Sequence, residues 1–281
     1  MCITTLKTGG TCFYRPLQTL SVPISLGSYF LTKGTFEFNA FRTLCCLKAI
    51  SNGHLKRNKA NLKAVSDLLG LSERTIQAHI DYLIESKLVR FNPNTLTLFL
   101  IGWEKLATLL GTPFRKAVLV ENLKHLKLYL FSGKANALLK AQKTLPCLKD
   151  LPKGRSEFIQ SGNESGRGRK LLVVDSYKDF NGISCDVLRQ EFSHSRMWSS
   201  RMKQAARKEG LLGYGKTVRV LAESETVFNM KHLSASFPFE FHKCFIIWNN
   251  GRYLFVERMA DSITTSVCVS RKRLACKNGY N

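Results

Sequence analysis

Residues 61–102 have the sequence NLKAVSDLLGLSERTIQAHIDYLIESKLVRFNPNTLTLFLIG, and this stretch decides the fold of the first half of the chain. Leu62, Val65, Leu68 and Leu69 recur at helical spacing. Gly70 follows them, at a point where a helix commonly ends in a left-handed residue. A helix that stops at Gly70 is therefore expected.

A second helix is expected immediately after this break. Ser72 is a good N-cap, because its hydroxyl can accept a hydrogen bond from an unpaired backbone N–H of the next turn. The spacing predicts a helix from about Glu73 to Glu85, with Ile76, Ile80, Leu83 and Ile84 on its inner face. The two helices are thus joined by a tight turn.

β-rich runs follow this helix pair. They lie at Arg90–Phe91 and Leu96–Ile101, and Asn92-Pro93-Asn94 supplies a turn signal between them. Upstream, Phe36–Ile50 has a broad apolar stripe that predicts another helix. Residues 36–102 are therefore expected to form three helices and a two-stranded ribbon.

This pattern resembles the winged helix-turn-helix DNA-binding family. Ser66 stands where that family has a small residue that lets two helices cross closely, and Gly70 stands at its turn glycine. Ile76 stands at the buried position of its recognition helix, and residues 71–76 look like its usual entry into that helix. The resemblance implies contact with double-stranded DNA, although the same fold also serves in protein docking.

The overall charge of the chain points to a polyanionic partner. Lysine and arginine outnumber acidic residues by 43 to 20, which gives a formal net charge of +23 over 281 residues. Nucleic acid is the first candidate, because neutralising phosphates releases counterions. No run is long enough to span a bilayer, and no basic amphipathic helix has an aromatic face, so no membrane partner is expected. The chain is long enough for two compact domains.

No enzymatic constellation stands out in the sequence. The nine cysteines lack zinc-knuckle or redox spacing, which favours a reducing, cytoplasmic setting, and the N-terminus does not resemble a secretion signal. Asp175, Asp179 and Asp186 lie near one strand end, with Tyr177 among them, but loop carboxylates alone are weak evidence for a metal. We expect no catalytic residues, no cofactor and no metal site.

The outward positions of the helix at residues 73–85 are expected to contact bases. Arginine and glutamine can pair bidentately with guanine and adenine edges. The base-contacting candidates are Ser72, Arg74, Thr75, Gln77 and Ala78. Neighbouring cations are candidates for phosphate contacts: Lys56, Arg57, Lys59, Lys63, Lys87 and Arg90. Acidic residues nevertheless balance these charges within the helix, so its face could meet another protein instead of DNA.

The second half of the chain contains a weaker internal copy of this motif. Trp198, Met202 and Ala205 repeat the spacing of the inner residues of the first motif. Leu211-Leu212 matches Leu88-Val89 after one extra residue. The corresponding turn contains no glycine, which departs from the family pattern.

The second copy carries the stronger positive charge. Ser195 is expected to cap its second helix, and a wing is expected at Gly213–Glu223 with Lys216 at the tip. The base-contacting candidates are Ser195, Arg196, Ser199, Ser200 and Lys203. The phosphate-contacting candidates are Arg201, Arg207, Lys208, Lys216 and Arg219.

The remaining segments complete an α+β, mainly α organisation. We expect an N-terminal arm (1–34) with β-like pieces at Leu20–Ile24 and Ser28–Leu31, a winged-helix domain (35–112), a helical connector (113–145), a flexible basic linker (146–170), a second divergent winged-helix-like domain (171–262) and a basic tail (263–281). Strands at Phe245–Trp248 and Tyr253–Val256 around an Asn-Gly turn predict a β-hairpin. The leucines of a helix expected at Val118–Ala141 form either a core helix pair or a dimerisation seam, which would make a homodimer.

Tandem winged units on one basic chain are similar in architecture to plasmid and phage replication initiators. A transcription regulator of a phage or mobile element is an equal contender, and the two differ in whether the partner is the replication or the transcription machinery. The alternative is a protein-docking winged-helix module whose basic half binds RNA or an anionic surface.

Overall fold

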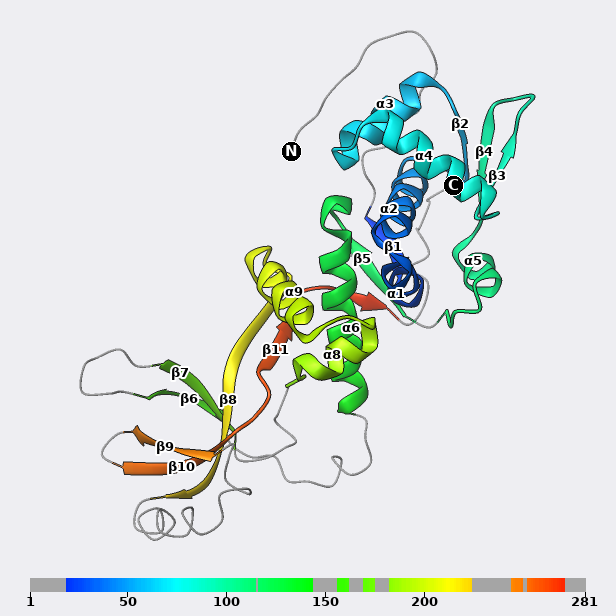
Figure 1. The fold of residues 1–281 in the computed structure, drawn as a ribbon. Coiled ribbons are helices and arrows are strands. Elements are labelled where there is room, and N and C mark those ends of the chain that lie inside the picture. The colour runs from blue at the N-terminus through cyan, green and yellow to red at the C-terminus, as the bar shows by residue number, and fades with distance from the viewer. Residues whose placement is uncertain are drawn as a thin grey trace, which may run out of the picture. The chain divides into compact units, whose positions relative to one another are not determined.

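The structure, a computed structural model, describes residues 19–114, 116–143, 156–161, 169–174, 182–223, 244–249 and 252–270. In these ranges the chain is α+β, as expected, and consists of eight α-helices, a short 3-10 helix and twelve strands. Figure 1 shows the arrangement of these elements. The chain divides into two compact units. Residues 1–114 and 119–126 form the first unit, and residues 115–118 and 127–281 form the second.

The first unit begins with a strand, β1 (Leu20–Pro23), and a helix, α1 (Ile24–Lys33). Leu26 and Phe30 of α1 are almost fully buried, and the Phe30 ring stacks on Phe41 with centroids 4.7 Å apart. The expectation of an arm with a β-like piece near residue 30 is therefore wrong for this segment. Its apolar residues become buried on one side of a helix instead of alternating along a strand.

The next helix, α2 (Thr35–Ile50), is the central element of the first unit. It packs against α1, α3 and α4, and Leu44 and Cys45 are fully buried. Near its end, Lys48 donates to the Ile101 carbonyl and lies 4.4 Å from the centroid of the Trp103 ring. Burial lowers the pKa of the Lys48 ammonium to about 8.

Helix α3 (Lys59–Leu69) ends before Gly70 as predicted, and α4 (Glu73–Glu85) has the predicted bounds. Each is amphipathic: α3 buries Leu62, Val65 and Leu69, and α4 buries Ile76, His79, Ile80 and Leu83. Both pack on α2, so burial of these apolar stripes holds the three helices together.

A small antiparallel sheet completes this part of the first unit. Its strands are β2 (His54–Lys56), β3 (Val89–Asn92) and β4 (Thr97–Leu100), in the order β2-β4-β3. The predicted ribbon is confirmed, but β2 was not predicted. It is three residues long, and its partner β4 lies more than forty residues further along the chain.

Helix α5 (Trp103–Leu109) follows the β2-β4-β3 sheet along the chain. The expectation of a continuous helix from Val118 is wrong, because the chain forms a strand, β5 (Ala117–Val120), then η1 (Leu123–His125) and then α6 (Leu126–Gln142). The Asn122 side chain accepts from Lys124 N and starts the new helical turn. Leu126 and Leu130 are fully buried, so they offer no exposed dimerisation seam.

The second unit contains a sheet in the order β6-β7-β8-β10-β9, with β11 paired to the first part of β8. The strand bounds are β6 (Ser156–Ser161), β7 (Arg169–Val174), β8 (Leu212–Glu223), β9 (Cys244–Asn249), β10 (Arg252–Arg258) and β11 (Ser262–Thr265). Strand β7 runs parallel to β8, and the other neighbours are antiparallel. Val218, Leu254 and Val256 form an apolar cluster on the sheet with Ile247.

The hairpin prediction is confirmed, since Asn249 of β9 pairs with Arg252 of β10. The wing prediction for Gly213–Glu223 is wrong. These residues belong to one long central strand, so Lys216 lies within β8 and not at a tip.

Two predicted flexible segments also contain strands. Residues 156–161 of the expected linker form β6, and the expected tail supplies part of β11 and then β12 (Val269–Ser270), which pairs with β5. Three other parts of these segments lie outside the described residues: 146–155 and 162–168 of the expected linker, and 271–281 of the expected tail. Asp175, Tyr177 and Asp179 also lie outside the described residues.

Helices α8 (Cys185–Phe192) and α9 (Arg196–Lys208) pack with α6 in the second unit. Phe131 of α6, Phe192 of α8 and Trp198 of α9 form an aromatic cluster with ring centroids 5.5–5.8 Å apart. Lys134 of α6 pairs with Glu191 of α8 across 2.6 Å. Among all the helices described, none has the length and apolar character that a membrane crossing requires.

Candidate nucleic-acid interface

The helix pairs α3–α4 and α8–α9 share one backbone plan. From the turn onward, each landmark of the second pair lies 123 residues after its counterpart, as residue 193 lies after residue 70 and residue 212 after residue 89. The first helices differ in length, because α3 has 11 residues and α8 has 8. Both second helices, α4 and α9, have 13 residues, and both lead directly into a strand. The internal copy expected from the sequence is therefore present as geometry, but without the extra residue that its sequence pattern implied.

The turn between the helices uses a left-handed residue in both copies. Gly70 has φ 67° and ψ 36°, and Ser193 has φ 53° and ψ 39°. The residue after each turn residue donates its N–H back to the first helix, from Leu71 to Ser66 O and from His194 to Arg189 O, both at 3.1 Å. Serine thus adopts the conformation that glycine adopts in the first copy, which explains how a turn without glycine keeps the same geometry.

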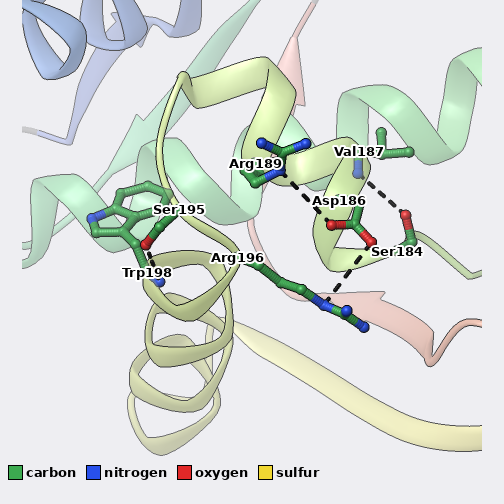
Figure 2. Close-up of polar contacts among 7 residues, drawn as sticks. All are labelled: Ser184, Asp186, Val187, Arg189, Ser195, Arg196 and Trp198. Carbon is green, nitrogen blue, oxygen red and sulfur yellow. Dashed lines mark hydrogen bonds and ion pairs between the residues drawn. The ribbon is translucent and has the colours of Figure 1, made fainter.

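The second helix of each pair begins at a serine cap. Ser72 Oγ accepts from Thr75 N, and Ser195 Oγ accepts from Trp198 N, each at 3.1 Å. Figure 2 shows Ser195 at the start of α9 and Ser184, which caps α8 through Val187 N. Both predicted caps, Ser72 and Ser195, are confirmed.

The exits from α4 and α9 also match. Leu88 N donates to Leu83 O and Leu211 N to Ala206 O, both at 2.9 Å. The residue before each of these leucines has positive φ: Lys87 at 59° and Gly210 at 68°. The second copy therefore has serine at the turn and glycine at the exit, whereas the first copy has glycine at the turn and lysine at the exit.

The face of α4 predicted to contact bases is exposed. Ser72, Arg74, Gln77 and Ala78 are exposed, and Thr75 is half-buried. Of the predicted phosphate contacts around it, Lys56, Lys59, Lys63, Lys87 and Arg90 are exposed. Arg57 differs, because its guanidinium lies 2.7 Å from Asp81 Oδ1 and packs near the Phe91 ring, so its charge is matched within the fold.

His79 lies on the inner side of α4. It is 2% exposed, its Nδ1 lies 2.9 Å from Thr43 Oγ1, and the Phe36 ring packs edge-on against it. Burial, and then the positive charge of Arg42, lower the pKa of the His79 imidazole. This histidine is a packed core residue.

The inner face of α9 differs from the prediction. Its buried residues are Ser199, Met202, Lys203 and Ala206, the counterparts of Ile76, His79, Ile80 and Leu83. Ser199 is 0% exposed and Lys203 is 4% exposed, so the expectation that both lie on the outward face for base contact is wrong. Trp198 caused this one-residue error, because its apolar ring was assigned to the core position that Ser199 occupies.

Lys203 is held by partners inside the second unit. Its ammonium donates to Asp261 Oδ2 at 2.8 Å and lies 4.8 Å from the centroid of the Tyr214 ring. Asp261 is 29% exposed, and Tyr214 belongs to β8. The charge that was expected to contact DNA instead connects α9 to the sheet beneath it.

The outer face of α9 is cationic. Arg196, Arg201, Arg207 and Lys208 are exposed, and α9 contains no acidic residue. Met197, which is 64% exposed, and Gln204 lie on the same outer side of α9. They were not among the predicted contact residues. They are the counterparts of Arg74 and Asp81 at the offset of 123 residues, so this offset identifies them as outward positions. Ser200 is half-buried.

The start of α9 is linked to α8 by one weak ion pair, between Arg196 and Asp186, and Asp186 also pairs with Arg189 within α8. Asp186 lies 3.8 Å from Arg189 and 3.9 Å from Arg196, as Figure 2 shows. All three groups are substantially exposed, so these long pairs contribute little to stability. Arg196 can therefore leave Asp186 for a phosphate at little cost.

The two remaining phosphate candidates lie on β8. Lys216 is exposed within the strand, whereas Arg219 is half-buried and donates to Glu257 Oε2 at 3.1 Å on the neighbouring strand β10. Arg219 therefore has its charge matched within the sheet, as Arg57 does in the first unit.

The turn of the second copy is covered by an aromatic contact. The His194 ring is tilted by 36° against the Trp198 ring with centroids 4.2 Å apart, and the Lys127 ammonium lies 5.4 Å from the centroid of the same indole. Burial, and then the charge of Lys127, lower the pKa of the His194 imidazole. Trp198 therefore covers the turn from outside the core stripe.

No protein-family model matches this chain, and no curated protein and no solved structure is significantly similar to it. The interpretation of the two helix pairs rests on their own geometry and charge.

Proposed function

We propose that the chain is a double-stranded DNA-binding protein of winged-helix type, in which α4 and α9 are the recognition helices. The observation that carries the proposal is the outer face of α9. It presents four exposed cations and no acid on a helix that begins at a capped turn identical in plan to that of α3–α4. Helices of this length fit the major groove, and exposed cations beside them neutralise phosphates.

The element order of the first unit supports the winged-helix assignment. A helix, a short strand, the helix pair and two further strands follow one another as α2, β2, α3, α4, β3 and β4. The strands pair in the order β2-β4-β3, so the strand before the helix pair joins the ribbon after it. In the second unit the helix pair leads into β8 and a larger sheet, which makes that unit a divergent relative of the plan.

The two helices divide the work of binding. α9 supplies electrostatic attraction, whereas α4 offers Arg74 and Gln77, two side chains able to pair bidentately with base edges. Arg57 neutralises the charge of Asp81, so Glu73 and Glu85 are the acidic residues of α4 that contribute negative charge near its outer face. Sequence-specific binding by two reading helices suits either a replication initiator or a transcription regulator of a phage or mobile element.

The test compares two triple variants that each remove three positive charges, one at the proposed interface and one elsewhere on the chain. The triple variant Arg201→Ala, Arg207→Ala, Lys208→Ala should weaken duplex binding by about 1 kcal/mol or more for each side chain that binds a phosphate, and should reduce the salt slope by about one unit for each phosphate that is no longer neutralised. The control is Lys33→Ala, Lys105→Ala, Lys140→Ala, which removes three exposed cations outside the helix pairs. Fluorescence anisotropy with a labelled duplex over a salt series measures both quantities, and equal losses of affinity in the two triples would refute the interface.

A second candidate function applies to the first unit alone. α4 contains three acidic residues, Glu73, Asp81 and Glu85, and one arginine, so its outer face is less cationic than that of α9. That face fits a protein-docking module, with RNA or an anionic surface as the partner of the basic half. Selection of binding sites from random duplexes separates the two candidates, because docking predicts no sequence enrichment that depends on Arg74 and Gln77.

A further inference from the structure

The outer face of the β2-β4-β3 sheet combines an exposed aromatic ring with basic side chains. Phe99 of β4 pairs with His54 of β2 on one side and with Arg90 of β3 on the other. Two residues before it, Thr97 pairs with Lys56 of β2. Alternate residues of a strand share a face of the sheet. The Phe99 ring therefore lies between the His54 imidazole and the Arg90 guanidinium across the strands, and the Lys56 ammonium lies on the same face one pair further along.

Burial separates the two faces of this sheet. Phe99 is 45% exposed, and His54, Lys56 and Arg90 are exposed, whereas the neighbouring Leu98 is 1% exposed and faces the core. The three strands contain no acidic residue. This face therefore presents an aromatic surface within a local excess of positive charge, and the core does not use the ring.

This combination fits a single-stranded nucleic acid better than a duplex. Unpaired bases expose their π-faces and stack on aromatic side chains, while cations follow the phosphates beside them. In an intact duplex the bases are stacked on one another, and an aromatic ring on a flat sheet face reaches only the backbone. A purely apolar partner would gain nothing from the flanking cations.

We propose that the outer face of the β2-β4-β3 sheet binds single-stranded nucleic acid, with one unpaired base stacked on Phe99 and phosphates held by Lys56 and Arg90. The stacking residue, Phe99, belongs to β4 and lies outside the recognition helices α4 and α9, whereas Lys56 and Arg90 are also candidates for duplex phosphate contacts, so the test rests on substitutions of Phe99. Failure of this proposal is distinguishable from failure of duplex binding, because the ligand and the variants differ.

The experiment uses the full chain with labelled oligonucleotides of about 12 nucleotides, within the range that such surfaces cover. Deoxythymidine and uridine oligomers are compared by anisotropy with a labelled duplex. Phe99→Ala should weaken single-strand binding by roughly fivefold or more, which corresponds to the loss of one stacked base. Duplex affinity should change by much less. The preferred oligomer then shows whether the ligand is DNA or RNA.

Three further variants make the outcome decisive. Leu109→Ala removes another exposed apolar side chain of the first unit, 56% exposed, and should leave single-strand binding unchanged. Phe99→Trp should retain binding and show fluorescence quenching when the oligomer is added, whereas Phe99→Leu keeps apolar area but loses stacking and should behave like the alanine variant. Wild-type affinity in Phe99→Ala or Phe99→Leu, no quenching in Phe99→Trp, or equal losses of affinity for single strand and duplex would each overturn the proposal.

Discussion

Lys203 of α9 lies where Ile80 lies in α4, and its ammonium is 2.8 Å from Asp261 Oδ2. A core position that is apolar in one helix pair is thus occupied by a charge in the other. The acid that matches this charge immediately precedes β11, which pairs with β8. The ion pair therefore connects the proposed recognition helix of the second unit to its sheet.

Substitution of Asp261 and substitution of Lys203 should lower the free energy of unfolding by different amounts. Asp261→Asn leaves a buried ammonium without a counter-charge and should cost about 2–3 kcal/mol of unfolding free energy. Lys203→Met should cost less, because the remaining carboxylate is 29% exposed and keeps water, and the methionine fills the same space. Urea unfolding of the full chain, followed by tryptophan fluorescence, measures the difference. Equal costs would contradict this assignment of burial.

The two turn residues should respond oppositely to substitution. Gly70→Ala should destabilise the first unit by about 1 kcal/mol, because its φ of 67° penalises a Cβ although no atom lies closer than 3.9 Å to it. Ser193→Gly should be neutral or stabilising by a few tenths of a kcal/mol, since relief of the left-handed conformation is offset by the entropy of glycine. Ser193→Ala is the control, because it keeps the Cβ. Thermal unfolding followed by circular dichroism measures all three, and a destabilised Ser193→Gly would count against the shared turn geometry.

The buried imidazole of His79 should make stability depend on pH. Its pKa is lowered in the folded state, so below the unfolded pKa of about 6.5 the unfolded chain binds the proton more readily. The contribution of His79 is fully present above that pH and is lost as the pH falls toward 5. His79→Gln should flatten this part of the profile in urea unfolding measured from pH 7.5 to about pH 5. His194→Gln is the matched variant in the second unit, since its pKa is lowered in the same direction. An unchanged profile in both variants would contradict their burial as neutral groups.

Base preference should be lost separately from each recognition helix. Arg74→Ala with Gln77→Ala should relax preference at one half-site by about 1–3 kcal/mol per bidentate contact, with little change in non-specific affinity. Arg201→Ala with Gln204→Ala should relax the other half-site and also lower the salt slope, because Arg201 belongs to the cationic face. Selection from random duplexes with full-length protein is the measurement. A single enriched half-site that responds to only one pair would restrict reading to that helix.

Local sequence was sufficient where a whole stripe was apolar. The end of α3, the bounds of α4, the caps at Ser72 and Ser195 and the exposure of Arg74 and Gln77 all follow from spacing and capping chemistry. In α9 the same reasoning failed, because Ser199 and Lys203 occupy core positions while Trp198 lies beside them. Hydrophobic periodicity cannot detect a core position whose polar side chain finds its partner 58 residues away.

Strands were predicted least well where their pairing is distant. β2 has one apolar residue and depends on β4, and β6 lies in a segment that composition alone marks as a linker. β8 was expected to end as a wing, but β10 and β11 from the end of the chain pair along it. Such strands are stabilised by partners that a local window does not contain.

The matched lengths of the two helix pairs have a practical consequence for engineering. Residues 72–88 and 195–211 run from cap to exit in the same number of steps, and a helix turns by about 100° per residue. A single inserted residue in either segment would rotate its reading face away from the partner, whereas substitutions at paired positions leave the backbone unchanged. We therefore expect that the exposed side chains of α9 can replace those of α4, and the reverse, without any change in the length of either helix.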